Sequence, residues 1–179
     1  MRYNAVMTDE VRRRVLEVYA RADAAVAAAG PRCDASGRCC RFTEYGHTLF
    51  ISHFEAELLL ESAPAYPRPV SPDGCPFQVG GLCTARESRP LGCRIYFCDP
   101  TYQDRMFEIT EDSIRRLKAI ADEYGTGWHY APLHHFLNAV VSAERPADPS
   151  PDSMTPSTTP STTPPSTRTP LPILPDPAG

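Results

Sequence analysis

The chain has 179 residues and a formal net charge of −4. This mild acidity gives no support for nucleic-acid binding, and no stretch approaches the roughly 20 apolar residues of a membrane span. The first 14 residues have no apolar run after their charges, so they do not read as a secretory signal. We therefore expect a cytoplasmic location, where thiols stay reduced.

The composition changes sharply at residue 145. Eleven of the twenty prolines lie in 145–179, mostly among Ser, Thr and Asp. Such a segment buries too little apolar surface to offset the entropy lost on ordering, so we expect a disordered tail. It has no clean PxxP repeat with flanking basic residues, so a flexible appendage is a simpler account than a partner-binding segment. Residues 1–144 remain for one domain with a modest core.

The clearest predicted helix spans residues 8–29. Thr8 is a good N-cap, two acidic residues follow it at the positive end of the helix dipole, and Gly30 ends the pattern. Apolar residues recur at spacings of three and four, which predicts one buried face. That face consists of Val11, Val15, Val18, Ala22, Ala25 and Ala29.

Three further helices are expected. Ser52 and Glu55 have the spacing of a capping box, which predicts that a second helix begins there. A third helix is expected over 111–124 with Thr110 as its cap, because apolar residues recur there at helical spacing. A fourth, shorter helix is expected from Pro132 onward, since proline suits the first helical position.

Only two short stretches of the sequence indicate β-structure. Residues 47–51 have weak strand character, and residues 79–82 are typical of a two-residue hairpin turn. A regular hairpin pairs Gln78 with Cys83, which puts Cys75 and Cys83 on opposite faces unless the ladder breaks near the intervening proline. The expected fold class is a small, α-rich α+β domain, with helices around two cysteine loops and a short hairpin.

The cysteines fall into two groups. Three lie in the stretch CDASGRCC and four lie between residues 73 and 99. Thiols gathered this way in a chain without a secretory signal suggest a metal centre more than a disulfide framework. Four thiolates complete a tetrahedral zinc site or hold an iron–sulfur cluster. The predicted metal ligands are Cys33, Cys39, Cys40, Cys75, Cys83, Cys93 and Cys98.

Seven thiols exceed one four-thiolate centre and fall one short of two. A second centre would need a histidine, a water or a bridging thiolate, and the spacings match neither common zinc knuckles nor common ferredoxins. Neighbouring side chains diverge, so we expect one of Cys39 and Cys40 as a ligand and the other as a ligand elsewhere or a packed thiol. Free buried thiols, disulfides and a Cys–His nucleophile pair remain as alternatives.

Charged and nitrogen-bearing side chains accompany the thiols. A thiolate-ligated centre carries negative charge, so nearby guanidinium groups can offset that charge and donate hydrogen bonds. Arg94, directly after a cysteine, is the best candidate for this contact, and Arg89 is the second, whereas Arg86 is expected to be solvated. His47 and His53 lie between the two groups and are candidate nitrogen ligands.

At CDASGRCC, CPF, GLC and RPLGCRIYFC the chain resembles the YkgJ-type cysteine-cluster family, described as a zinc- or iron-chelating domain. The family pattern runs CxxCGxCC, a helix opened by a Glu-containing turn, CPFL, a further Cys and RPxxCRxY. These motifs correspond here to residues 33–40, 52–55, 75–77, 83 and 89–96. The resemblance covers roughly residues 32–99, and its second half is the more specific.

One residue departs from the family pattern. Ser36 stands at the family's second cysteine, and serine is a poor zinc or iron ligand, so that position is dispensable or this chain binds fewer ions.

Some relatives are labelled Fe–S oxidoreductases, and flagellin lysine N-methylases share the cluster. The resemblance implies metal binding, with a four-iron cluster and zinc both open, and an Fe–S oxidoreductase or electron-transfer accessory with a redox protein partner. The alternative is a zinc-stabilised structural or interaction module without catalysis.

Overall fold

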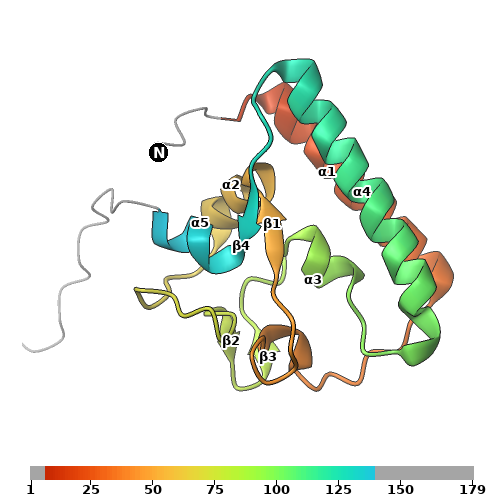
Figure 1. Ribbon diagram of the computed structural model, residues 1–179, viewed down its shortest axis with the longest axis vertical. Helices are drawn as coiled ribbons and strands as arrows, with labels where there is room; N and C mark the ends of the chain where they lie inside the picture. Colours follow the sequence, from red (N-terminus) through yellow and green to blue (C-terminus); the bar gives the residue numbers. More distant parts are fainter. Residues whose placement is uncertain (1–6, 140–179) are drawn as a thin grey trace, which may run out of the picture. The chain divides into compact units, whose positions relative to one another are not determined.

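A computed structural model describes residues 7–139 of the chain (Figure 1). Its elements are α1 (Asp9–Ala29), the 3-10 turn η1 (Arg38–Cys40), β1 (Phe50–Ser52), α2 (His53–Ser62), β2 (Gln78–Val79), β3 (Leu82–Cys83), α3 (Leu91–Ile95), the 3-10 turn η2 (Pro100–Tyr102), α4 (Gln103–Tyr124), β4 (Tyr130–Pro132) and α5 (Leu133–Ala139). The fold is mostly helical α+β with two small two-stranded sheets. Within these residues, no helix is long and apolar enough to cross a membrane. The tail expected over 145–179 lies outside the described residues.

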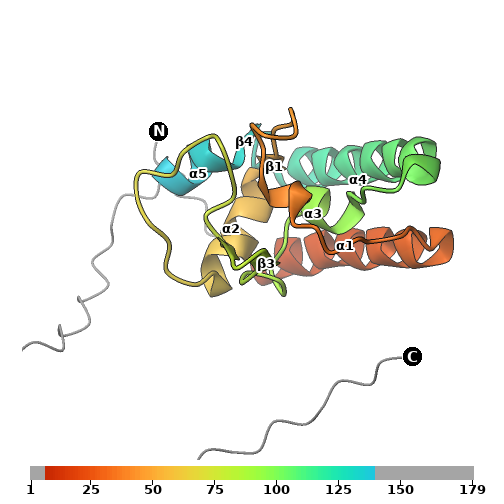
Figure 2. The ribbon, with the colours of Figure 1, turned by 90° about the horizontal axis from the view of Figure 1, so that it is seen from below.

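The two longest helices, α1 and α4, lie side by side and antiparallel (Figures 1 and 2). Ion pairs join Arg14 to Glu123 and Arg21 to Asp112 across this pair. The predicted start and end of α1 are confirmed: the Thr8 hydroxyl accepts a hydrogen bond from a helix N–H, and Gly30 ends the helix at φ 61°.

The third predicted helix begins earlier than expected. α4 starts at Gln103, so Thr110 lies inside it and is not its cap; the Thr110 hydroxyl donates to the carbonyl of Met106 at 2.8 Å. The turn η2 precedes the helix directly, and the carboxylate of Asp99 caps that turn by accepting the N–H of Thr101 at 2.9 Å. The first turns of α4 are largely polar, and the regular apolar spacing begins only after them. The sequence pattern therefore places the start of this helix too late.

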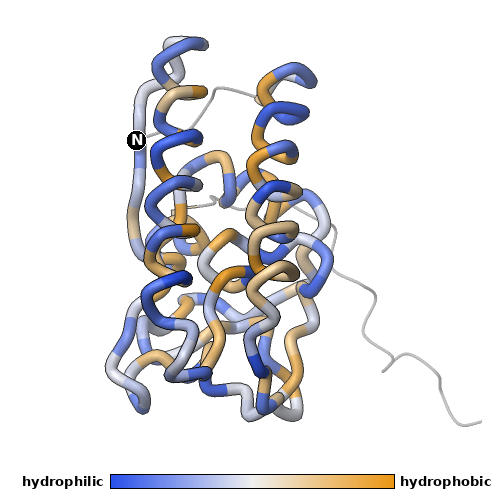
Figure 3. The backbone as a smooth tube through the Cα atoms, turned by 90° about the vertical axis from the view of Figure 1, so that its right-hand side faces the viewer, coloured by the Kyte–Doolittle hydropathy of each residue, from blue (hydrophilic) through white to orange (hydrophobic). Residues whose placement is uncertain are grey.

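A hydrophobic core fills the space between α1, α3 and α4. In Figure 3 hydrophobic and hydrophilic residues alternate along both long helices, as expected of helices buried on one side. Tyr19 and Val26 are buried in α1, whereas Ala25 is half-buried and Ala29 exposed, so the last turn of the predicted apolar face was wrong. The buried residues are Val11, Val15, Val18, Tyr19, Ala22, Val26, Phe54, Leu58, Leu91, Ile95, Tyr102, Ile109, Leu117, Ile120 and Ala121.

A second, smaller core lies around the two sheets, α2 and α5. β1 pairs antiparallel with β4, which was not predicted, and Phe50 lies opposite Pro132. β2 and β3 form the predicted hairpin, with Gln78 opposite Cys83. The buried residues of this core are Phe42, Ile51, Ala56, Leu59, Val70, Phe77, Ala85, Leu133, Phe136 and Leu137.

A buried carboxylate joins the two cores. The predicted capping box at the start of α2 is confirmed: Glu55 Oε2 accepts from the N–H and the hydroxyl of Ser52, both at 2.7 Å. Its Oε1 accepts the N–H of Leu91 at 2.8 Å, so one side chain that is 2% exposed also fixes the start of α3. Burial raises the pKa of this carboxyl, and the bonds from Ser52 and Leu91 work against that rise.

Candidate metal centre

The first cysteine loop is held against the hairpin by a close backbone contact. Gly37 has φ 69°, and a Cβ there would lie 2.4 Å from the Gln78 side-chain nitrogen, which donates to the Gly37 carbonyl at 2.9 Å. The same glycine carbonyl accepts the N–H of Cys40 at 3.1 Å and closes η1. This tight turn is the bent backbone that the adjacent pair Cys39 and Cys40 requires.

The second loop is tied to the first by Cys75. Its N–H donates to the carbonyl of Cys40 at 2.8 Å, and its own carbonyl accepts the N–H of Gln78 at 3.2 Å in a turn. The hairpin ladder consists of two residue pairs and ends at Gln78. Cys75 therefore lies outside the ladder, which resolves the conflict between its expected face and that of Cys83.

Cys93 is carried by α3, a helix that the sequence did not reveal. The helix has five residues, begins after Pro90, and the Pro90 carbonyl accepts the N–H of Cys93 at 3.0 Å. Such a short helix has too few turns for apolar periodicity to show. The available signal was the proline before it, which suits the start of a helical turn.

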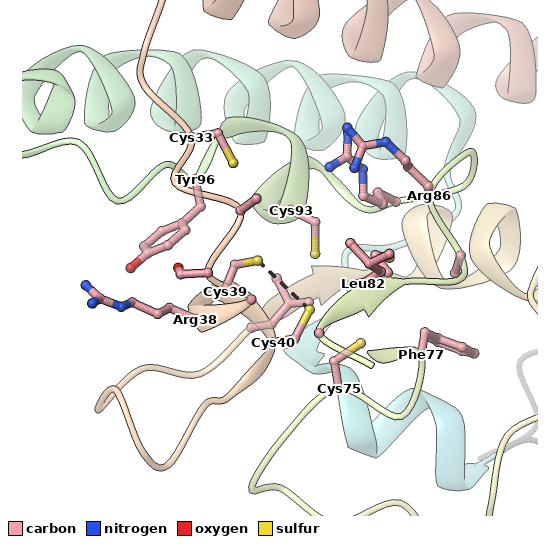
Figure 4. Close-up of a pocket in the computed structure, with 18 of the residues that line it drawn as sticks. Cys33, Arg38, Cys39, Cys40, Cys75, Phe77, Leu82, Arg86, Cys93 and Tyr96 are labelled. Atoms are coloured by element: carbon pink, nitrogen blue, oxygen red, sulfur yellow. Dashed lines mark hydrogen bonds between the residues drawn. The ribbon is translucent and has the colours of Figure 1, made fainter. Parts of the chain in front are cut away.

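All seven cysteines line one cavity of about 370 Å³, which we call the cysteine cavity. None of them forms a disulfide. In Figure 4 the sulfurs of Cys39, Cys40, Cys75 and Cys93 point toward one region, and the sulfurs of Cys39 and Cys40 lie 3.9 Å apart. The structure thus brings together every predicted thiol ligand, from segments spread over residues 33–98.

The thiols do not yet have the geometry of a single-ion site. Among residues 7–139, no three His, Cys, Asp or Glu side chains form a group ready to hold one metal ion. A mononuclear centre here would need the sulfurs to draw together. A larger centre, whose thiolates bind different metal atoms, would need less contraction.

The crowding of the thiols favours their protonated forms. A hydrogen bond with Cys40, followed by burial, raises the pKa of Cys39. The bond with Cys39 lowers the pKa of Cys40, but a bond with Cys75 and burial outweigh it and raise that pKa to about 12. Burial, and then the neighbouring thiols, raise the pKa of Cys93. A bound cation removes this cost, because metal binding displaces thiol protons.

The two candidate arginines have different surroundings. Arg89 lines the cysteine cavity, and its Nε is buried with no hydrogen-bond partner in the described part of the chain. Arg94 does not line it: its guanidinium donates to the carbonyls of Arg89 and Glu87, both at 2.8 Å, pairs with Asp23 and lies 4.7 Å from the ring centre of Tyr19. Arg94 therefore holds the loop to α1, and Arg89 is left to face the thiols.

The candidate histidines lie outside the cysteine cavity. His47 approaches it most closely: its Nε2 is 3.4 Å from the carbonyl oxygen of Cys39, and its ring stacks on Tyr96 at 5.6 Å. His53 is buried between Phe54 and Trp128, and it lines a different, small cavity. Neither histidine is among the residues that line the cysteine cavity.

Two further residues of the cavity wall were not expected there from the sequence. Arg86, expected to be solvated, is exposed and yet lines the cavity. Ser36, at the position of the missing family cysteine, lines it as well. Tyr96 and Phe97, which lie between the last two cysteines in the sequence, add aromatic surface to the same wall.

No protein family model, no curated protein and no solved structure matches the chain. The resemblance to the YkgJ-type family therefore rests on the motif residues alone.

Proposed function

We propose that this protein is a YkgJ-type cysteine-cluster protein whose thiols hold an iron–sulfur cluster of the four-iron type. The observation that carries the proposal is the convergence of all seven cysteines on one cavity of about 370 Å³. Free buried thiols have no reason to converge from separate loops, whereas ligands of one centre must.

The lack of a ready three-ligand group among the described residues favours a cluster over a single zinc ion. Zinc–sulfur bonds of about 2.3 Å in a tetrahedron put the four sulfurs about 3.8 Å from one another. No three potential ligands among residues 7–139 are grouped for one ion. Thiolates on different irons lie farther apart, so the cavity needs less rearrangement to hold a cluster.

The remaining walls suit a negatively charged, oxidisable group. Arg89 supplies a buried, unpartnered N–H and positive charge beside the thiols, and Arg86 adds a second charge at the wall. Tyr96 and Phe97 add aromatic surface to the wall. A four-iron cluster supplies one-electron transfer when bound, so we infer an electron-transfer or oxidoreductase accessory role with a redox protein as partner. A reducing, cytoplasmic compartment would keep the seven thiols available.

A zinc-stabilised module without catalysis is the second candidate. The sulfurs of Cys39 and Cys40 lie 3.9 Å apart, close to the edge of a tetrahedral zinc–thiolate site. A third cysteine, Cys75, is tied to Cys40 by a backbone hydrogen bond of 2.8 Å, so three cysteines of a mononuclear site are held near one another. In this account the metal stabilises the loops and takes no part in a reaction.

The test is the metal and acid-labile sulfide content of anaerobically purified protein, together with its visible absorption spectrum. About four irons and four sulfides per chain, with a brown chromophore, are expected for a four-iron cluster. One or two zinc ions without sulfide would replace the redox proposal by the zinc module. Protein with neither metal would overturn both.

A further inference from the structure

A second cavity of about 260 Å³ meets the cysteine cavity. We call it the ring cavity, because four aromatic or imidazole side chains line it. Two cysteine side chains, Cys39 and Cys93, line both cavities, so a molecule in the ring cavity lies directly beside the thiols. The ring-bearing residues are His47, Phe50, Tyr96 and Tyr130.

The walls of the ring cavity are two stacked pairs. The rings of His47 and Tyr96 are 5.6 Å apart and inclined by 15°, and those of Phe50 and Tyr130 are 5.7 Å apart and inclined by 27°. Phe50 and Tyr130 belong to the paired strands β1 and β4, and Tyr130 also stacks on Trp128 at 5.8 Å. These walls are therefore held in place before any ligand arrives.

Two of these aromatic side chains stay partly open to solvent. Phe50 is 43% and Tyr130 41% exposed, which is unusual for two neighbouring large aromatic side chains. A ring that covers these two exposed side chains removes apolar surface from water.

We propose that the ring cavity binds a small, planar ring molecule. Its aromatic walls favour a flat ring by stacking and edge contacts. The volume of about 260 Å³ admits a molecule of one or two rings. Binding of the ring molecule does not require the metal. Only the further step, that this molecule is a substrate held beside the metal centre, rests on the proposed function.

The probe is phenol, compared with cyclohexanol by saturation-transfer NMR on the full-length protein as purified anaerobically. The two alcohols have similar size and the same hydroxyl, and they differ in planarity and ring electrons. Phenol is expected to bind about tenfold more tightly, since one or two aromatic contacts account for a factor of that order. Equal binding of the two, or no binding of phenol, would overturn the inference.

Two substitutions show whether phenol occupies this cavity. Thr48 is exposed and lines the ring cavity, so Thr48→Phe is expected to fill it and weaken phenol binding about tenfold or more. Val79→Phe, at the exposed tip of the hairpin, adds the same ring elsewhere and is expected to leave binding unchanged. Unchanged binding in Thr48→Phe would place phenol elsewhere and contradict the inference.

If Thr48→Phe does not melt cooperatively, and so is not folded, a third substitution replaces it. Tyr130→Leu keeps apolar bulk but removes one wall ring, so phenol binding is expected to weaken several-fold and cyclohexanol binding to stay the same. An equal loss for both alcohols would count against ring recognition. Iron, zinc and sulfide are measured on the same samples, so failure of metal binding and failure of ring binding are recorded separately.

Discussion

Two regions of this molecule are stabilised by different means. The helical half, α1 and α4, consists of helices of 21 and 22 residues whose facing sides share a large apolar core. The cysteine half, residues 33–49 and 73–98, has no regular element longer than the five residues of α3. Apolar burial accounts for the stability of the helical half. The cysteine half surrounds a cavity lined by thiols, so its stability depends on what fills that cavity.

The halves share the apolar core at Leu91 and Ile95 of α3, and polar contacts add to it. Glu55 accepts the N–H of Leu91 and so fixes α3, which carries Cys93. Arg94, on the same helix, pairs with Asp23 and lies over the ring of Tyr19 in α1. The comparison therefore predicts which substitutions damage the metal centre, which damage the helix packing, and which damage both.

The largest effect is expected from Cys93→Ser. Cys93 lines the cavity together with Cys39, Cys40 and Cys83, and serine is a poor ligand for zinc or iron, so more than half of the bound metal should be lost. Cys33→Ser, at an exposed cysteine, is the matched control and should lose less. Metal and sulfide analysis of both variants checks this. Equal retention of metal in Cys93→Ser and wild type would contradict it.

Glu55→Gln is expected to weaken both halves. The amide keeps one acceptor oxygen but turns an NH₂ group toward donors, so at least one buried hydrogen bond to a charged acceptor is lost, at a cost of about 2–3 kcal/mol. Urea unfolding of the metal-loaded protein measures this loss. Glu44→Gln, which removes a surface ion pair with Arg41, should cost less than about 1 kcal/mol. Similar losses in the two variants would refute the joining role of Glu55.

Substitutions of Arg89 and Arg94 should have different effects, the first on the metal centre and the second on the packing of the protein. Arg94→Met removes the stack on Tyr19 and the pair with Asp23 and should cost about 1–2 kcal/mol of unfolding free energy, with an unchanged metal spectrum. Arg89→Met should alter the reduction potential of the centre, because it removes the positive charge that lines the cavity. A spectrum changed by Arg94→Met and untouched by Arg89→Met would reverse this assignment.

A small effect on stability is expected from Gly37→Ala. Gly37 and Gly46 have φ 69° and 65°, so alanine at either position should cost about 1 kcal/mol of backbone strain. At Gly37 the added Cβ also meets Gln78, whereas at Gly46 nothing lies within 4 Å. Metal content should therefore fall in Gly37→Ala and stay at the wild-type level in Gly46→Ala. Matching metal contents would show that the Gly37 contact does not shape the cavity.

Local signals predicted the parts of the fold that local interactions form. Thr8 and Gly30 bound α1 as expected, and the capping box of Ser52 and Glu55 opens α2. The hairpin register followed from its two-glycine turn. In contrast, β4 exists through its pairing with β1, and α3 begins where Glu55 accepts a distant N–H, so neither has a signature in its own residues.

The same division holds for the site. The sequence identified the seven thiols, because their number and grouping are visible in the chain. Their convergence depends on contacts between distant residues, such as the bond from Cys75 to the carbonyl of Cys40 and the packing of Gly37 on Gln78. Sequence spacing also suggested that Arg94 would face the thiols, and only the structure shows its guanidinium engaged with α1.

Amide hydrogen–deuterium exchange of the metal-loaded and the metal-stripped protein tests most directly whether the cysteine half is stabilised by a bound centre. Removal of metal is expected to speed exchange over residues 33–49 and 73–98, while the amides of α1 and α4 keep most of their protection. Unchanged protection of the cysteine half after the metal is removed would contradict the account.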